Sequence, residues 1–537
     1  MKPNLYWPIL IGMIALCLRL WAIDFGLPYL YHPDETNKIT IAQNIFKTGS
    51  LSPHYFSKPT LFIYLNAAAY VPYYLTGKAL GWFDKRGEIP APVELVQAVG
   101  RAETSTVILG RVLTTLFGVA SVLLVYFSAK KLMATDAGAS FAALMMAVSP
   151  TNVANSRYVT ENTFLVFFIL LAVVASLRIY HRGAGWDYVF GGIACGLAAS
   201  AKYNGCLAVI LVLTAHFLRT GWNGFHDSKL RLALMAVPLA FLATTPFTLL
   251  DYPKFLEDTL YEVRHYWTGH RGMEDRAFTW YLSYLWGIEG PICILGMLGA
   301  GVGLWLGCKR TILLSVFPLF YFAFVSSFAV RNDRTLLPVM PFIYLLAACF
   351  IDRSAAAIRR LHGGVRRKLL ATGLAVALIV STAIPTSATV RSAIQLSAVD
   401  SRERARRWIA ENTIAIPRGS KIALERYSPF VDPAHFLVEG FERIIDRPVE
   451  WYVERRFDFI VFSEGSFGRF YREPDRYQDQ VRSYQRFFDT FTPLNVFVDE
   501  QAVVNFGFKI TGIRLPLPDY SSVGVYEIRV YRVKNRE

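Results

Sequence analysis

The chain has 537 residues, of which 53% are hydrophobic and 18% are charged, and its mean hydropathy is +0.33. Ordinary globular proteins carry about 25% charged residues, so this composition excludes a disordered chain, a coiled coil and a collagen-like protein and favours a polytopic membrane protein. The net charge is +15, which in a membrane protein is typical of basic cytoplasmic loops, so nucleic-acid binding is not expected.

Eleven apolar segments are candidates for membrane-spanning helices, each of which needs about 20 residues. The first is predicted to be a retained helix, because it lacks the small-residue cleavage site of a signal peptide. The six cysteines lie in or beside apolar segments without CxxC spacing, so neither a disulfide framework nor a cysteine zinc site is expected. The candidate spans are 5–23, 107–128, 138–150, 159–177, 188–201, 204–218, 232–250, 286–307, 311–329, 336–351 and 369–390.

Loop charges predict the orientation of these helices. If the N-terminus is cytoplasmic, nearly every inner loop is basic, as the positive-inside rule requires, whereas the outer connections near 151–158 and 330–335 contain only isolated arginines. With eleven spans, the C-terminal part is then extracytoplasmic. The sequence therefore predicts a multi-pass protein of the plasma or inner membrane.

Three segments do not fit the alternation of membrane spans and short loops. Residues 24–106 are predicted to form a long outer loop, in which the aromatic stretch 59–80 reads as an interfacial helix. Residues 251–285 form a second outer loop. Residues 391–537 contain strand-like runs such as FDFIVFSE from Phe457 and helix-like runs such as SRERARRWIAEN from Ser401. We expect a transmembrane domain over 1–390 and an extracytoplasmic α/β domain over 391–537.

Ionisable residues near membrane depth are costly unless they face a cavity or a partner, which makes them candidates for function. Asp34 and Glu35 follow the first span, and Glu161 lies at the outer entrance of the fourth. A structural role is an alternative for each acid, since Asp34 is also suited to cap a helix and Glu161 to sit favourably at a helix start. Two carboxylates on one outer face are, however, what acid–base chemistry needs.

Four cations are predicted to lie at the same face, where they are suited to bind a phosphate. Lysine at an interface also snorkels to lipid phosphates, and an arginine next to Asp333 also forms internal pairs, so a structural role stays open for some of them. Arginine presents a rigid fork of donors to phosphate oxygens. The four residues are Lys58, Lys202, Arg331 and Arg334.

Histidines in the outer loops are weak candidates for a metal site. His265 and His270 lie five residues apart in HYWTGH, and His54 is a possible third ligand. A zinc site needs three or four ligands, so the sequence supports no confident metal centre and no required cofactor.

A phosphate held at the membrane surface is a lipid phosphate, and acids beside it suggest group transfer from a lipid carrier. The chain has no P-loop, no GxGxxG motif before a strand and no GxSxG motif, which argues against nucleotide hydrolysis and serine-hydrolase chemistry. No cytoplasmic nucleotide-sugar domain is visible either.

The order of these motifs resembles the GT-C glycosyltransferases of the protein O-mannosyltransferase type (glycosyltransferase family 39) and the aminoarabinose lipid A transferases. The resemblance covers roughly residues 5–350. It rests on the acidic pair after the first helix, the Lys58-Pro59 step, Arg111, RYVTENTF before span four, GLAASAKYNG around Lys202, and RNDRTLLPVMPF.

The resemblance implies a function and roles for these residues. Asp34 would be the general base that deprotonates an acceptor hydroxyl, with Glu35 supporting it and Glu161 orienting the acceptor or a metal. The cations would hold the phosphate of a polyprenyl-phosphate sugar donor. The acceptor stays open between a protein, a lipid and a glycan.

The chain departs from its relatives at three points. Ser57 stands where the aminoarabinose transferases have a zinc-binding acid, and no WWDYG motif of the oligosaccharyltransferases is present. The predicted α/β domain also differs from the β-trefoil of eukaryotic O-mannosyltransferases. A transporter or flippase of anionic polyprenyl-phosphate lipids is the alternative function, although no internal repeat favours it.

Overall fold

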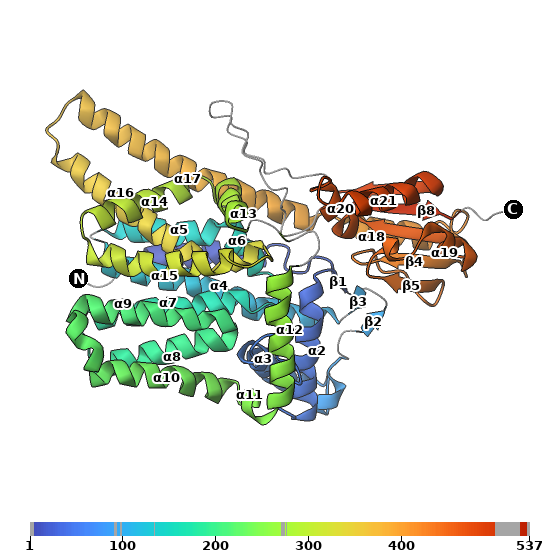
Figure 1. Cartoon of the computed structure of the whole chain (residues 1–537), viewed down its shortest axis with the longest axis horizontal. Coiled ribbons are helices and arrows are strands. Elements are labelled where there is room, and N and C mark those ends of the chain that lie inside the picture. Colours follow the sequence, from blue (N-terminus) through green and yellow to red (C-terminus); the bar gives the residue numbers. More distant parts are fainter. Residues whose placement is uncertain are drawn as a thin grey trace.

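The computed structural model describes residues 5–90, 94–96, 99–101, 103–133, 135–269, 274, 277–499 and 527–533. A bundle of long helices occupies one side of the molecule, a smaller α/β domain occupies the other, and two helices cross the end of the bundle between them (Figure 1). This arrangement confirms the prediction of a mostly helical membrane protein with a C-terminal domain that contains a β-sheet.

The bundle contains the predicted spans and packs closely where small residues meet. A Cβ atom on Gly192 or Gly196 of α8 would lie 2.2 or 2.4 Å from a backbone oxygen of α10, so only glycine allows this close helix approach. The bundle helices are α1 (Tyr6–Leu20), α4 (Thr104–Leu132), α5 (Asp136–Val148), α6 (Pro150–Asn155), α7 (Asn162–His181), α8 (Gly185–Ala201), α9 (Val209–Thr220), α10 (Ser228–Thr244), α14 (Ile292–Trp305), α15 (Lys309–Ser326), α16 (Met340–Arg360) and α17 (Val365–Ser397).

Each of the eleven predicted spans falls on a helix, but not every helix has the length and composition of a span. Within the described residues six helical stretches are long and apolar enough to cross a membrane. A bent pair, Ala277–Glu289 and Ile292–Trp305, makes a seventh if it is one broken span. The predicted number of eleven is therefore not confirmed. The six stretches are Thr104–Leu132, Asn162–His181, Tyr203–Thr220, Lys309–Ser326, Met340–Arg360 and Val365–Glu411.

The two segments predicted to be long outer loops fold into helices and short strands at one end of the bundle. In Figure 1, α2 and α12 run across the direction of the bundle helices. Pro33 is the first residue of α2, where its missing N–H costs nothing, and Gly49 ends the helix with φ +74°. The elements of the two segments are α2 (Pro33–Thr48), α3 (Leu61–Ala79), α12 (Tyr252–Thr268), α13 (Ala277–Tyr284), and an antiparallel sheet of β1 (Tyr29–Leu30), β3 (Val99–Arg101) and β2 (Glu94–Val96). The short helix α11 (Phe247–Leu250) directly precedes the second segment.

The C-terminal domain has a mixed five-stranded sheet in the order β5-β4-β6-β8-β7. β4 pairs in parallel with β5 and β6, and β8 pairs in antiparallel with β6 and β7. α17 continues to Ser397, past the predicted domain boundary at 390. The elements are α18 (Ser401–Glu411), β4 (Lys421–Glu425), β5 (Leu437–Phe441), α19 (Val449–Glu454), β6 (Phe459–Ser463), α20 (Glu464–Tyr471), α21 (Gln478–Thr490), β7 (Thr492–Val498) and β8 (Glu527–Arg532).

Aromatic and charged contacts join this domain to the crossed end of the bundle. Phe430 stacks on Tyr29 with ring centroids 4.8 Å apart, and the Arg402 guanidinium lies 4.1 Å from the centroid of the Tyr31 ring. Because Tyr29 and Tyr31 directly precede α2, the C-terminal domain packs beside the start of that helix.

Candidate active site

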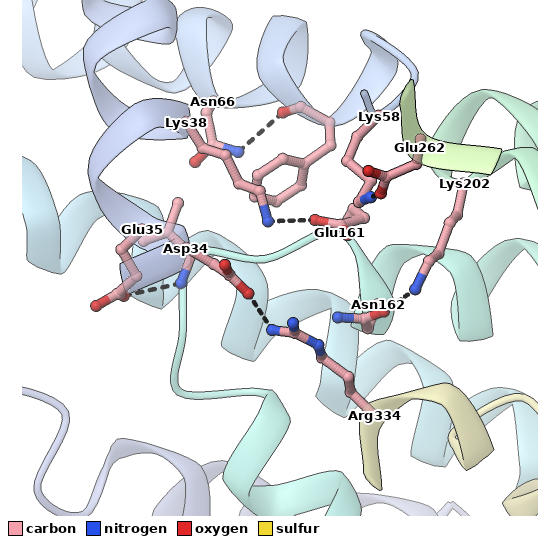
Figure 2. A network of polar contacts seen from close by, with 12 residues as sticks. Asp34, Glu35, Lys38, Lys58, Asn66, Glu161, Asn162, Lys202, Glu262 and Arg334 are labelled. Carbon is pink, nitrogen blue, oxygen red and sulfur yellow. Dashed lines mark hydrogen bonds and ion pairs between the residues drawn. The ribbon is translucent and has the colours of Figure 1, made fainter. Parts of the chain in front are cut away.

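Most of the predicted site residues meet at the crossed end of the bundle, although they come from distant parts of the chain (Figure 2). Asp34 and Glu35 lie in the first turn of α2, and Glu161 directly precedes α7. Lys202 lies between α8 and the 3-10 helix η2 (Tyr203–Ala208), and Arg334 lies in the 3-10 helix η5 (Asp333–Leu336). Packing of the bundle therefore gathers them around one polar region.

Asp34 forms an ion pair with Arg334 that is open to solvent. The two side chains are 35% and 33% exposed. Burial opposes ionisation of the Asp34 carboxyl, but the charges of Arg334 and Lys38 outweigh it and hold the pKa well below the ordinary value. Asp34 is therefore a charged carboxylate that other molecules can reach.

Glu35, the next residue, is completely buried and points the other way. Its carboxylate accepts two hydrogen bonds from Arg111 of α4, at 3.0 and 2.8 Å, and one from the backbone N–H of Val159 at 2.9 Å. Arg111 also donates to the backbone oxygens of Ile23 and Phe25, at 2.7 and 3.0 Å. The pair therefore fastens the start of α2 to α4 and to the segment before α7.

Lys38 extends from α2 to the carboxylate of Glu161, and Figure 2 shows this contact beside the Asp34–Arg334 pair. Both side chains are less than a tenth exposed. Lys38 was not among the residues predicted from the sequence. Its spacing of four residues from Asp34 was the available signal, because residues four apart lie on the same helix face.

Two further lysines complete the polar region. The Lys202 ammonium donates to the side-chain oxygen of Asn162 at 3.0 Å, and Lys58 forms an ion pair with Glu262 of α12. Burial lowers the pKa of Lys202 to about 8; the charge of Glu161 opposes this effect and that of Arg334 adds to it. The neutral partner of Lys202 leaves its positive charge uncompensated by direct contact.

Arg331 lies apart from this region. It pairs with Glu473, just beyond α20 in the C-terminal domain, and its guanidinium is 6.0 Å from the centroid of the Trp280 ring. The two arginines lie three residues apart but have different surroundings. Arg334 faces the carboxylate of Asp34, whereas Arg331 joins the bundle to the C-terminal domain.

The two described candidate histidines, His54 and His265, lie in different surroundings. His54 is largely exposed and its Nδ1 lies 2.9 Å from a carboxylate oxygen of Asp251. His265 lies on α12 parallel to the ring of Tyr261, and His270 falls outside the described residues. In the described part of the chain, no three side chains of His, Cys, Asp or Glu are placed to bind a metal ion together.

Comparisons with known proteins show which known structures this fold resembles. A sequence profile of the dolichyl-phosphate-mannose-protein mannosyltransferase family matches residues 93–261. ArnT from Cupriavidus metallidurans in the apo state has a similar structure, with a TM-score of 0.53 and 14% identity over 98% of each chain. The chain has the fold of the GT-C glycosyltransferases. No curated protein sequence matches it.

A second GT-C structure covers nearly as much of the chain. The archaeal oligosaccharyltransferase AglB from Archaeoglobus fulgidus, in complex with an inhibitory peptide and a dolichol-phosphate, has a TM-score of 0.50 and 12% identity. The match covers 93% of this chain and 75% of AglB. The family-profile match includes Arg111, Glu161 and Lys202, whereas Asp34 and Arg334 lie outside it.

Two more residues, Asn162 and Glu262, contact the lysines of the candidate site but were not predicted as site residues. Asn162 accepts from Lys202, and Glu262 pairs with Lys58. Asn162 was detectable as the neighbour of Glu161. Glu262 had no sequence signal, because it lies in a long outer loop whose position against Lys58 depends on the tertiary structure.

Proposed function

We propose that the chain is a membrane glycosyltransferase that moves a sugar from a polyprenyl-phosphate carrier to an acceptor hydroxyl. The observation that carries this proposal is the meeting of two carboxylates, Asp34 and Glu161, with the cations Lys202, Lys58 and Arg334 at one end of a GT-C bundle. The matched family is named for a dolichyl-phosphate sugar, and AglB was solved with a dolichol-phosphate. Both names support a lipid-phosphate donor.

The charges suit a single displacement at the anomeric carbon. The acceptor oxygen forms a bond to that carbon, the bond to the phosphate oxygen breaks, and the acceptor proton passes to the Asp34 carboxylate. Positive charge develops on the sugar and negative charge on the departing phosphate. Cations placed beside the leaving phosphate stabilise this charge separation. The displacement inverts the anomeric configuration.

Asp34 is suited to be the base because it is charged and a third exposed, so an acceptor can approach it. In this structure Arg334 neutralises it. A donor phosphate that binds Arg334 would share that cation and raise the basicity of Asp34. Base and leaving group would then be coupled through one arginine, and the base would gain strength when the donor is bound.

Glu35 and Lys38 have positioning roles in this proposal. Glu35 has no exposed surface and its carboxylate is saturated by Arg111 and Val159, so it fixes the direction of α2 rather than touching substrate. Lys38 holds Glu161, whose buried carboxylate is also attracted by the charges of Lys202 and Lys58. Glu161 is proposed to help orient the acceptor.

The reaction is proposed to occur at the extracytoplasmic face of the plasma or inner membrane. Basic residues concentrate at the opposite end of the bundle, which favours that end as cytoplasmic. The C-terminal domain packs beside the start of α2 and is proposed to lie in the extracytoplasmic space. The identity of the acceptor follows from neither the site nor the fold, so the assay must supply a mixture of acceptors.

Sugar transfer in reconstituted liposomes tests the proposal. The liposomes contain labelled polyprenyl-phosphate sugars and membrane extract, and the proteins compared are wild type, Asp34→Asn and Asp84→Asn. Asp84 is an exposed carboxylate of the same outer loop, so its variant controls for the loss of one charge. A general base contributes roughly 100- to 10,000-fold to a rate, so we expect a loss of that size only in Asp34→Asn.

The flippase alternative predicts a different pattern in the same assay. Labelled lipid would cross the bilayer equally with wild type and Asp34→Asn, and no label would leave the carrier with either protein. That result would refute the transferase proposal. Equal losses in Asp34→Asn and Asp84→Asn would refute the assignment of Asp34 as the base.

A further inference from the structure

A cavity lies at the far end of the bundle, away from α2 and α12. It has a volume of about 440 Å³, within the range of small-ligand sites. Leu132 at the end of α4 and Tyr180 near the end of α7 line it, together with residues of α15 and α16. Because α7 has 20 residues, its two ends are about 30 Å apart, so this cavity is separate from the candidate active site.

The lining of this cavity is basic. Lys309, Arg310 and Arg353 contribute three cations and Asp352 contributes one carboxylate. The Lys309 ammonium and the Arg310 guanidinium donate to backbone oxygens of other helices, each at 3.2 Å. These contacts hold the side chains in place and leave a net positive charge in the lining.

Arg353 has a different contact, with a thiol. Its guanidinium donates to the sulfur of Cys308 at 2.7 Å, and Cys308 itself lines the cavity directly before α15. Burial raises the pKa of Cys308, but hydrogen bonds from Thr311 and the charge of Arg353 lower it below the ordinary value overall. The cavity therefore contains a thiol that can report on its occupancy.

Exposed tryptophans indicate at which depth of the membrane this end of the bundle lies. Trp186 lies in the first turn of α8, Trp222 follows α9, and Trp305 ends α14, so all three lie at the same end of the bundle as the cavity. They are 80%, 78% and 85% exposed. Tryptophan is enriched at the level of lipid headgroups, so the cavity opens where headgroup phosphates lie.

We propose that this cavity binds the phosphate of an anionic phospholipid headgroup from the leaflet opposite the candidate active site. Arginine forks suit phosphate oxygens, and basic pockets between membrane helices are known sites for such headgroups. The apolar surfaces of Leu132 and Tyr180 are suited to contact the glycerol and the start of the acyl chains. The same cations could also bind a soluble phosphate ion. The three exposed tryptophans at this end of the bundle favour the lipid headgroup.

Protection of Cys308 from N-ethylmaleimide tests this proposal on the full chain in neutral detergent. Delipidated protein is mixed with phosphatidylglycerol, phosphatidylcholine or inorganic phosphate, and mass spectrometry follows each cysteine. At a lipid concentration ten times the Kd, we expect phosphatidylglycerol to slow modification of Cys308 by about tenfold. Phosphatidylcholine and inorganic phosphate should have little effect. The exposed Cys17 and Cys206 are internal controls whose rates should not change.

Arg310→Gln and Arg360→Gln are a matched pair of variants for this assay. Arg310 lines the cavity without touching Cys308, and Arg360 is an exposed arginine at the end of α16 outside the lining. Both changes remove one positive charge. We expect Arg310→Gln to lose the protection and Arg360→Gln to retain it. Slow modification of the buried Cys195 and Cys293 without lipid, as in wild type, will show that each variant is folded.

Three outcomes would overturn the proposal. Protection by inorganic phosphate as strong as that by phosphatidylglycerol would mean a site for soluble phosphate. Equal protection by both lipids, or equal loss in both variants, would mean a nonspecific effect of lipid or charge. If Cys308 does not react, bound lipid counted by native mass spectrometry replaces the thiol as the readout, and an equal count for Arg310→Gln and Arg360→Gln refutes the site.

Discussion

The candidate active site has an inner and an outer part that use similar charges in opposite ways. The inner part is the Glu35–Arg111 pair, with no exposure of either side chain and with hydrogen bonds to the surrounding backbone. The outer part contains Asp34 with Arg334, and Lys202 with a neutral amide. A saturated buried pair cannot exchange its partner, whereas an open or uncompensated charge can accept a ligand. Adjacent acids in one helix turn thus have different surroundings, because one is buried and the other is partly exposed.

Loss of the inner pair should have the largest effect on stability. Glu35→Gln leaves the Arg111 charge buried without its partner, which commonly costs about 3–5 kcal/mol. We expect a large fall in the midpoint of thermal unfolding in detergent. Asp34→Asn should change it little, because its charge is partly solvated. If Glu35→Gln were as stable as wild type and lost only activity, the inner pair would be part of the catalytic machinery.

Loss of an outer cation should affect the rate instead. Lys202→Met removes a positive charge that we assign to the donor phosphate, and removal of one such group commonly costs on the order of 100-fold in kcat. Sugar transfer at saturating donor measures this change. The midpoint of unfolding should stay close to wild type, because the partner of Lys202 is a neutral amide. A rate within twofold of wild type would remove Lys202 from the site.

The pKa of Lys202 predicts a pH dependence of donor binding. With a pKa of about 8 in the free protein, Lys202 is protonated below that pH and loses its charge above it. A sugar phosphodiester does not titrate in this range, so its affinity should fall by at most about tenfold per pH unit above about pH 8. Arginine stays charged, so Lys202→Arg should remove this dependence. Titrations of labelled donor across this range provide the measurement, and an identical profile for both proteins would contradict the assignment.

The contact between the bundle and the C-terminal domain should have the smallest effect. Arg331 and Glu473 are 14% and 26% exposed, and pairs of this kind contribute about 0.2–1 kcal/mol. A double-mutant cycle with Arg331→Gln and Glu473→Gln should give a coupling free energy in that range. A coupling free energy well above this range, together with loss of sugar transfer, would indicate that Arg331 binds the donor together with Arg334.

Much of the site was predictable because the signals were local in the sequence. Asp34 follows the first predicted span, Glu161 lies at the start of the fourth, and Lys202 and Arg334 lie between later spans. The number of spans between these four residues predicts that they lie at one membrane face. Lys38 was detectable in principle from its four-residue spacing to Asp34. Glu262 was not, since nothing in a long polar loop specifies which lysine it will meet.

Hydropathy alone determined where the helices of the bundle lie and that the last part of the chain is a different kind of domain. These properties depend on runs of neighbouring residues, and burial of apolar surface acts on each run as a unit. Only the tertiary structure decided the partners of the charged residues. Glu35 pairs with Arg111, Asp34 with Arg334, and Arg331 with Glu473. Ion pairs join residues far apart in the chain, so their partners are set by the distances that packing creates.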